Sequence, residues 1–384
     1  MELLPAPTLT DVVVIGGGQA GLAIGYHLRR AEVDFVILDA QSGPGGAWRH
    51  GWDSLRLFSP APYSSLPGWP MPVQPGEPFP TAGHVRAYLS RYERRYELPV
   101  RHNVPVDAVT SVNTGSSCTG GFVVHTRTEN WRARAVVSAT GTWRRPVRPR
   151  YPGAASFTGV QLHAVAYHRP DRFTGQHVLV VGGGNSAAQI VAEVSTVADT
   201  TWCTLRPPRF MPDDVDGSVL FDLATQRQRA ARAGETHFRG GGLGDIVMVP
   251  PVKAARGRGV MVARPMFTAF TATGVRWNDG SALDVDAVIW CTGFEPDLHH
   301  LDPLGPAARD ARAGTPSTTD GTRSTDHPGL YFLGYGEWTG PASATLVGAG
   351  RTARLCAAQI VEQLADGHPA DRPGEVRDTR RRSG

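Results

Sequence analysis

The chain has 384 residues, a formal net charge of +4 and 19% charged residues. At roughly 150 residues per domain this length suggests two or three domains, and such a chain can bury a core without disulfides or metals. The small net charge excludes a strongly basic nucleic-acid-binding surface. Because the N-terminus lacks a signal-peptide pattern and the apolar runs are too short to span a membrane, we expect a cytoplasmic protein with neither nucleic acid nor membrane as a partner.

The cysteines are scattered singly along the chain and form no C-x-x-C pair; they are Cys118, Cys203, Cys291 and Cys356. This spacing excludes a local dithiol redox centre and a zinc ribbon, and we expect no metal site. Thiolates bind trivalent arsenic, but Cys203 and Cys291 lie in or beside expected buried strands. A role in the core is therefore favoured for them.

The N-terminal segment predicts a strand, a glycine turn, a helix and a second strand. Residues 12–15 and 35–38 are short apolar runs typical of buried strands, and residues 18–30 carry apolar side chains at helical spacing. Such a βαβ unit is expected to have a right-handed crossover. The stretch 43–80 is rich in Gly, Pro, Trp and Ser, which predicts a long functional loop.

A second βαβ unit follows later, with a strand at 177–181, a helix at 185–194 and a strand at 201–205. Other expected elements are a helix at 82–96, strands at 104–112, 122–126, 133–137, 287–290 and 329–333, and a final helix at 345–364. Residues 238–244 form a loose glycine-rich stretch, and the polar tail beyond residue 367 is expected to be disordered. We predict an α/β protein with two Rossmann-like dinucleotide-binding domains, the second inserted in the first.

The first glycine turn fits the pattern G-x-G-x-x-G. Its residues are Gly16, Gly17, Gly18, Gln19, Ala20 and Gly21. In this pattern the first glycine permits a tight turn, the second lets the backbone approach a pyrophosphate, and the third allows close packing of helix and strand. Asp39 ends the next strand, where an acidic residue accepts hydrogen bonds from an adenosine ribose. The alternative, a purely structural glycine turn, is disfavoured by this context.

The second turn runs from Gly182 through Gly184, Asn185 and Ser186. Arg206 follows the next strand, and a guanidinium there can pair with a 2′-phosphate that an acid would repel. This site is therefore expected to prefer NADPH over NADH, unless Arg206 simply faces solvent at the end of a strand. Two dinucleotide sites in one chain indicate FAD on the N-terminal unit and NADPH on the inserted one. We expect residues 1–145 and 285–384 to form a discontinuous FAD-binding domain and residues 146–284 the NADPH-binding domain.

Between the two turns lies the run FTGVQLHAVAY, in which Phe157, Gly159, His163 and Tyr167 match the fingerprint F-x-G-x-x-x-H-x-x-x-[YF]. With this motif the chain resembles the class B flavin monooxygenases, in particular the flavin-containing monooxygenases, over roughly residues 10 to 365. Tyr167, where Baeyer–Villiger relatives have Trp, points to the branch that oxygenates heteroatoms. His163 is expected to be a hinge residue between domains, the alternative being an acid/base.

The resemblance implies further cofactor contacts. The Gly-Gly-x-Trp element places Gly46 and Trp48 beside the flavin, and the Ala-Thr-Gly element contributes Thr140 and Gly141. Contacts are also expected from Ala40 and Val106, and the N-terminus of the final helix is expected to face the flavin pyrimidine. The family often has an asparagine near the flavin in the loop where this chain has Ser59, which leaves the residue that stabilises the flavin peroxide unassigned.

The runs GWDSLRLFSP, SLPGWP, PRFMPDDVDG, GDIVMVPPVK and GYGEWTGPASATL look like the flavoprotein monooxygenases of arsenic-resistance operons (ArsO type). This implies an enzyme in which NADPH reduces FAD, O2 forms a C4a-hydroperoxide on the flavin, and oxygen passes to a soft nucleophile: a trivalent arsenic compound or an N or S atom of a small molecule. Two alternatives stay open: an NADPH-dependent flavin reductase or oxidase, and a non-catalytic redox sensor. The oligomeric state is also open, a homodimer included.

Overall fold

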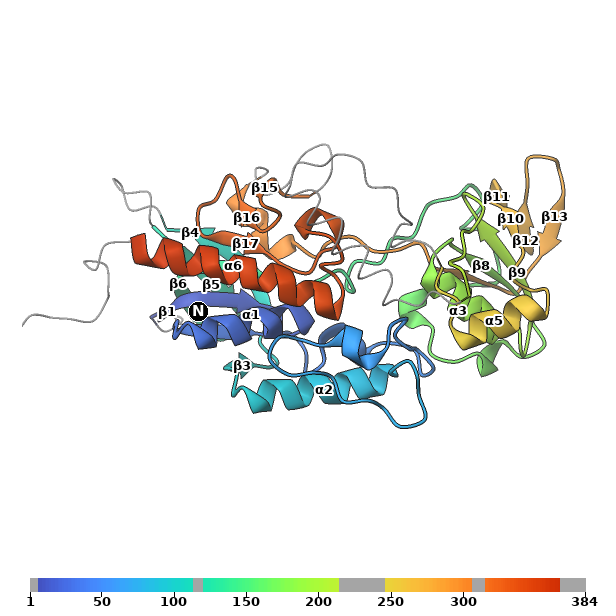
Figure 1. The fold of residues 1–384 in the computed structure, drawn as a ribbon. Coiled ribbons are helices and arrows are strands. Elements are labelled where there is room, and N and C mark those ends of the chain that lie inside the picture. Colours follow the sequence, from blue (N-terminus) through green and yellow to red (C-terminus); the bar gives the residue numbers. More distant parts are fainter. Residues whose placement is uncertain (1–5, 113–119, 214–245, 306–314, 367–384) are drawn as a thin grey trace, which may run out of the picture.

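The computed structural model describes residues 6–112, 120–213, 246–305 and 315–366. These form two units joined by two extended segments (Figure 1). Cys118, the glycine-rich stretch 238–244 and the tail beyond residue 367 lie outside the described residues. Within these ranges no helix has both the length and the apolar character needed to cross a membrane.

The larger unit is built on a nine-stranded sheet with the central order β15-β16-β17-β6-β1-β2-β3, to which β5 and β4 add an antiparallel ribbon beside β6. Pairings from β17 through β6, β1 and β2 to β3 are all parallel. Its strands are β1 (Thr8–Ile15), β2 (Phe35–Leu38), β3 (Val100–Arg101), β4 (Val106–Ser111), β5 (Phe122–Thr126), β6 (Asn130–Ser138), β15 (Thr318–Thr319), β16 (Arg323–Ser324) and β17 (Leu330–Phe332).

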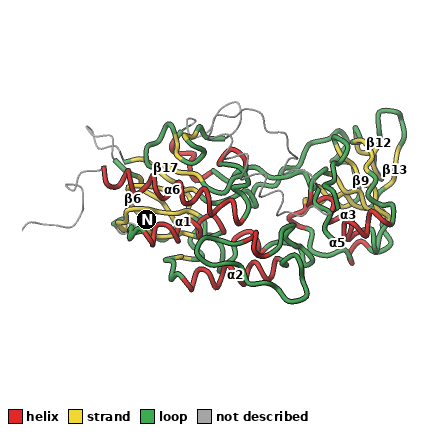
Figure 2. The backbone as a smooth tube through the Cα atoms, in the orientation of Figure 1, coloured by secondary structure: helices red, strands yellow, loops and turns green. Residues whose placement is uncertain are grey.

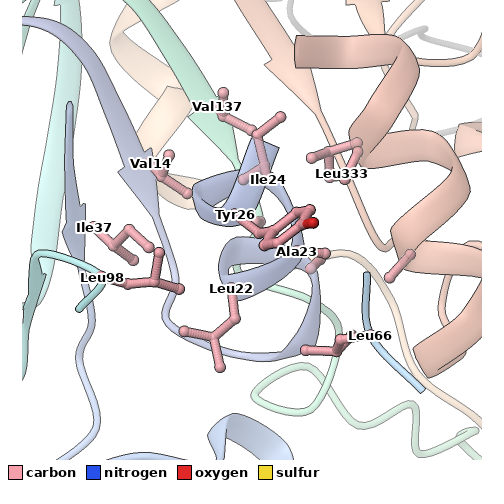
Figure 3. Packing of buried hydrophobic residues seen from close by; sticks show 14 of the residues in the cluster. Val14, Leu22, Ala23, Ile24, Tyr26, Ile37, Leu66, Leu98, Val137 and Leu333 are labelled. Atoms are coloured by element: carbon pink, nitrogen blue, oxygen red, sulfur yellow. The ribbon is translucent and has the colours of Figure 1, made fainter. Parts of the chain in front are cut away.

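The described helices of the larger unit are α1 (Gln19–Arg30), α2 (Ala82–Arg95) and α6 (Leu346–Asp366); α1 packs on β1 and β2 and contacts both other helices. The side chains of Leu22 and Ile24 on α1 are fully buried and belong to one cluster with Val14, Ile37 and Val137 of the sheet (Figure 3). The same cluster includes apolar residues of α2 and α6, so this core holds α1 in place directly after β1. The glycine turn between β1 and α1 is thus fixed at the carboxyl edge of a parallel sheet, where such folds bind ligands.

The smaller unit contains a five-stranded parallel sheet, in the order β10-β9-β8-β14-β7, and a separate antiparallel sheet of β11, β12 and β13. The helices are α3 (Asn185–Val194) and α5 (Pro250–Gly257). The strands are β7 (Val160–His163), β8 (His177–Val181), β9 (Asp199–Thr204), β10 (Ala263–Pro265), β11 (Ala269–Phe270), β12 (Gly274–Arg276), β13 (Ala282–Asp284) and β14 (Ala287–Trp290).

The two segments that connect the units run side by side as an antiparallel ribbon (Figure 2). The Val147 amide donates to the Gly293 carbonyl at 3.0 Å, the Glu295 amide to the Arg145 carbonyl at 2.9 Å, and the Asp297 amide to the Gly141 carbonyl at 3.0 Å. The chain therefore leaves the larger unit after β6 and returns to it after β14, which confirms the predicted insertion of one dinucleotide-binding fold in another.

Most expected elements are present, and the differences concern short strands. The 43–80 loop contains only two 3₁₀ turns, at Gly46–Arg49 and Ala61–Ser64. The strands β3, β7, β10 to β13, β15 and β16 were not expected, because segments of two to four residues show no measurable period. The eight-residue helix α5, which lies in a stretch of mixed composition, was also not expected. The final helix begins at Leu346 rather than at Thr345, since the Thr345 hydroxyl accepts the Gly348 amide at 3.2 Å as a cap.

Candidate functional site

The turn between β1 and α1 requires glycine at two positions and leaves space at a third. Gly16 has a φ of +109°, and a Cβ there would lie 2.5 Å from the Ala139 carbonyl oxygen. A Cβ on Gly21 would overlap the Gly16 carbonyl. Beside Gly18, in contrast, the nearest atom to an added Cβ is 3.8 Å away. This backbone cradle at a helix N-terminus has the shape and the polarity that a dinucleotide pyrophosphate needs.

Gln19 links the cradle to two distant segments. Its side-chain carbonyl accepts the Trp48 indole N–H at 2.9 Å, and its amide donates to the Ala344 carbonyl at 2.6 Å. Ala344 lies just before α6, so the N-termini of α1 and α6 are neighbours at the same edge of the sheet. Both helix dipoles place positive potential there, which favours an anionic ligand.

Asp39 follows β2 and is only 4% exposed. A Cβ on Gly17 would lie 2.9 Å from the Asp39 carboxyl group, so this side chain packs directly beneath the cradle. The His102 Nδ1 atom is 3.0 Å from the Asp39 Oδ2 atom, a contact that the sequence pattern did not predict. Ala40 is exposed next to it, and Val106 opens β4 as a half-buried residue.

The Ala-Thr-Gly segment after β6 is held by a buried hydroxyl network. The Tyr335 hydroxyl lies 2.7 Å from the Thr140 Oγ1 atom and 2.5 Å from the Ser138 Oγ atom, which is also 3.0 Å from His300 Nε2. Thr140 Oγ1 contacts the Asp297 carbonyl at 2.6 Å. Burial raises the pKa of Tyr335 to about 12, so its hydroxyl stays protonated at neutral pH. The Thr140 side chain thus anchors the return segment, and Gly141 provides the left-handed turn, with a φ of +70°.

The second cradle repeats this geometry between β8 and α3. Gly182 has a φ of +138°, and a Cβ there would overlap the Cys291 carbonyl oxygen, whereas a Cβ on Gly184 would meet no atom within 4 Å. The Asn185 Oδ1 atom accepts the Val247 amide at 2.9 Å, so this side chain holds the 246–249 segment against the start of α3. Ser186 is exposed on the first turn of α3. The open space beside Gly184 therefore fits a second pyrophosphate.

The two cradles differ at the end of the following strand. The Gly16 amide donates to the Leu38 carbonyl at 2.8 Å, and the Gly182 amide donates to the Cys203 carbonyl at 2.9 Å. This register aligns Asp39 with Thr204, not with Arg206. The expectation that Arg206 takes the place of the acid is therefore corrected: β9 ends at Thr204, and Arg206 is exposed two residues further on.

The fingerprint residues lie where the smaller unit meets the connecting segments. His163 ends β7, accepts the Val165 amide on Nδ1 at 3.3 Å and lies 3.2 Å from the Gly293 carbonyl through Nε2. Because a carbonyl only accepts, Nε2 carries the proton. Burial lowers the pKa of His163, which keeps the ring neutral. Both ring nitrogens of His163 are thus engaged by backbone groups.

The other fingerprint side chains also have packing roles. Tyr167 is fully buried between Trp52 and Phe173, and its hydroxyl donates to the Glu193 carboxylate at 2.8 Å. A Cβ on Gly159 would overlap the Phe157 ring and lie 2.5 Å from the Asp286 carbonyl oxygen. The contacts of these fingerprint side chains are thus packing contacts and one hydrogen bond.

A row of rings that the sequence did not predict crosses the connecting ribbon. His50 stacks on Trp143 with ring centroids 6.2 Å apart, Trp143 stacks on Phe294 at 5.5 Å, and Phe294 meets the edge of His163 at 5.1 Å. The signal in the sequence was that Phe294 directly follows Thr292-Gly293, and that Trp143 comes two residues after Gly141, so both are aromatic residues beside the expected turns.

Ser59 and the cysteines have structural surroundings. The Ser59 hydroxyl is buried and lies 2.8 Å from the Ser64 hydroxyl. Cys203 is in β9, Cys291 follows β14 and Cys356 is in α6, and burial raises the pKa of the Cys291 thiol to about 12. Across the described ranges no group of three His, Cys, Asp or Glu side chains is placed to hold a metal ion.

Comparison with known proteins agrees with this arrangement. The model of the pyridine nucleotide-disulphide oxidoreductase family matches residues 13–219. A flavin-containing monooxygenase from Stenotrophomonas maltophilia superposes with a TM-score of 0.83 and 47% identity, covering 93% of this chain and 99% of that chain. A CzcO-like oxidoreductase of Geobacillus kaustophilus is 31% identical over 88% of this chain and 94% of its own length. The probable indole-3-pyruvate monooxygenase YUCCA8 of Arabidopsis thaliana is 26% identical over 84% of this chain and 83% of its own length.

These relatives confirm the predicted α/β fold, the enzyme class and the pair of cofactors. As a monooxygenase, the protein acts on a small molecule together with O2. The chain belongs to the pyridine nucleotide-disulphide oxidoreductase family and, within it, to the flavin-containing monooxygenases, which are FAD- and NADPH-dependent enzymes.

Proposed function

We propose that residues 1–145 and 285–384 bind FAD, that residues 146–284 bind NADPH, and that the enzyme transfers oxygen to a soft nucleophile. The observation that carries this proposal is the pair of glycine cradles, each with open space beside its middle glycine, at Gly18 and at Gly184. Each cradle ends a parallel strand, so both dinucleotides would lie at the carboxyl edges of their sheets.

The larger cradle suits FAD. The Gly16 to Gly21 backbone would hold the pyrophosphate, and Asp39 would accept hydrogen bonds from the adenosine ribose. Ala40 directly follows Asp39, and Val106 opens β4 two residues after Val104, whose amide donates to the Asp39 carbonyl. The N-terminus of α6, joined to Gln19 through Ala344, supports placing the isoalloxazine ring there, beside Gly46, Trp48, Thr140 and Gly141, because a helix N-terminus stabilises negative charge on a reduced ring.

The smaller cradle suits NADPH. Gly182, Gly184 and the first turn of α3, with Asn185 and Ser186, would take the pyrophosphate. The exposed guanidinium of Arg206 would pair with the 2′-phosphate, which NADH lacks. In this proposal the fingerprint residues Phe157, Gly159, His163 and Tyr167 fix the orientation of the NADPH unit on its connecting ribbon.

Bound FAD supplies the activation of O2, and this chain's residues bind, orient and exclude water. The half-buried ring of Trp48 lies beside the first cradle, and those of Trp143 and Phe294 lie on the connecting ribbon; these rings would limit access of water to the reacting centre. We propose a thioether, an amine or a trivalent arsenic compound as the oxygen acceptor. Among the described cysteines, Cys203, Cys291 and Cys356 lie on or beside different elements, so we propose arsenic as a substrate rather than as a ligand of these thiolates.

The test is turnover of the FAD-loaded enzyme with NADPH under ¹⁸O2, with a thioether, a tertiary amine, arsenite and methylarsenite offered separately. We expect one ¹⁸O atom in the product of at least one acceptor and NADPH consumption that matches product formation. NADPH oxidation with matching peroxide release, and no label in any of the four, would favour the flavin oxidase or reductase alternative. No oxidation of NADPH at all would contradict both.

A further inference from the structure

The side chain of Asp39 is fixed by a histidine that the sequence pattern gave no reason to choose. His102 Nδ1 lies 3.0 Å from Asp39 Oδ2, and its Nε2 lies 3.2 Å from Glu93 Oε1 on α2. All three side chains are largely buried, with exposed fractions of 18% for His102, 6% for Asp39 and 15% for Glu93. His102 is thus a bridge between the end of β2 and the helix α2.

Backbone hydrogen bonds hold His102 opposite Asp39. The Asp39 amide donates to the Arg101 carbonyl at 2.9 Å, and the Val104 amide donates to the Asp39 carbonyl at 2.9 Å. The Asn103 amide donates to the Gln41 carbonyl at 2.9 Å, with Asn103 in a left-handed turn at a φ of +61°. The backbone on both sides of His102 is therefore hydrogen-bonded to the segment that carries Asp39, which fixes the point from which the imidazole reaches Asp39.

Glu93 gives His102 its second support. Its Oε2 atom is buried and makes no hydrogen bond within the described part of the chain, so His102 is the hydrogen-bond partner of this carboxyl group there. Burial raises the pKa of Glu93, while the neighbouring His102 opposes that shift. A buried carboxyl group that leaves one oxygen without a hydrogen bond lowers the stability of the fold. A role in holding His102 gives a reason for this cost.

We propose that His102, braced by Glu93, is a positioning residue for Asp39 and thereby sets the affinity for the adenosine ribose of FAD and the preference for FAD over FMN. This inference rests on the proposed placement of FAD in the first cradle. With Oδ2 occupied by His102 and packed against Gly17, the Asp39 carboxylate has Oδ1 left to accept from a ribose hydroxyl. FMN lacks the adenosine half, so it makes no use of this oxygen.

The test titrates FAD and, separately, FMN into the full-length flavin-free protein and follows the quenching of flavin fluorescence. Replacing His102→Leu removes both contacts, His102→Gln keeps one donor, and Glu93→Gln weakens only the brace. The matched control is His125→Leu, because His125 is also half-buried and lies between two polar side chains, 2.9 Å from Thr110 and 3.2 Å from Asn130. Thermal unfolding of each flavin-free variant shows whether it is folded.

We expect His102→Leu to weaken FAD binding about tenfold, which corresponds to about 1.4 kcal/mol, and to leave FMN binding unchanged. His102→Gln and Glu93→Gln should each lose about threefold, on the scale of one weakened hydrogen bond. In the Asp39→Ala background, which itself loses at least as much FAD affinity, His102→Leu should add nothing. If His102→Leu does not fold, the two glutamine variants take its place, and each is also combined with Asp39→Ala. In those double variants the loss of FAD affinity should equal that of Asp39→Ala alone.

The outcomes separate the two proposals. If Asp39→Ala leaves FAD affinity unchanged, FAD does not use this strand end, and both the placement and the role of His102 are overturned. If Asp39→Ala weakens FAD binding but the His102 variants match His125→Leu, only the role of His102 is overturned. Equal losses for FAD and FMN would also overturn it, because a general structural defect does not distinguish the two flavins.

Discussion

The two cradles have the same backbone geometry but differ in the residue that follows the next strand. In the first, the residue after the strand is Asp39, whose carboxylate is buried and contacts His102. In the second, the aligned position holds Thr204, and the charged residue is an exposed arginine two positions later. A prebuilt, desolvated acceptor suits a group that stays bound, because little ordering is left to be done on binding. An exposed guanidinium suits a coenzyme that must enter and leave in each cycle.

The largest loss of stability is expected at the third small residue of the pattern, which is Gly21 in the first cradle and Ala187 in the second. Gly21→Ala would push a Cβ into the Gly16 carbonyl oxygen, whereas the same position of the second cradle already holds the buried Ala187. We expect Gly21→Ala to destabilise the protein by about 3 kcal/mol and to abolish flavin retention. Ala187→Gly should cost only about 1 kcal/mol. Chemical denaturation measures both, and equal losses would show that the two turns are packed alike.

A smaller and more selective effect is expected at the middle glycines, where an added Cβ meets open space. Gly18→Ala should reduce FAD affinity at least tenfold, about 1.4 kcal/mol, and Gly184→Ala should do the same to NADPH, each sparing the other ligand. Fluorescence titration of flavin and equilibrium dialysis of NADPH test this pair. Both variants are expected to melt within a few degrees of the parent, so a shared loss of both ligands would contradict the assignment of one dinucleotide to each cradle.

A substitution at Arg206 tests whether the charge beside the second cradle sets the preference for NADPH over NADH. Arg206→Asp should weaken NADPH binding by about 1–3 kcal/mol, the scale of one charged hydrogen-bonded pair. NADH binding should not fall, because NADH lacks the 2′-phosphate. Steady-state KM values for the two coenzymes are the measurement, with Arg209→Asp as the neighbouring control. An unchanged ratio between the coenzymes would remove Arg206 from the site.

The smallest effect is expected at the ribbon between the cradles. Burial lowers the pKa of His163 below the ordinary 6.5, so the unfolded chain takes up a proton before the folded one does. The contribution of His163 to stability is therefore complete above pH 6.5 and declines as the pH falls toward the lowered pKa. His27 and His50 shift in the same direction through burial. His163→Gln should flatten part of this acid-side decline in melting temperature; an identical pH profile would mean that His163 is not desolvated.

Local patterns in the sequence predicted what depends on local geometry. The strands β2, β5, β8 and β14 and the helix α3 have the expected bounds, because glycine turns and apolar runs delimit them. His102 could not be predicted, since its contact with Asp39 depends on the pairing of the two-residue strand β3 with β2. The alignment of Asp39 with Thr204 likewise follows from backbone hydrogen bonds in two sheets. Counting residues along the chain had instead predicted Arg206, two positions later, as the counterpart of Asp39.

The insertion also dictates an order of events during synthesis. The strand β6 pairs with β17, and α1 packs against α6, yet β17 and α6 are made only after the whole inserted unit has left the ribosome. Until then the last three residues of β6, where β17 pairs, have an unpaired edge, and α1 has an uncovered apolar face. Both features favour association between nascent chains. The inserted unit has all of its parallel strands between residues 160 and 290, so it can complete its sheet first. Chaperone demand should therefore fall on the larger unit, whose sheet is completed late, and not on the inserted unit.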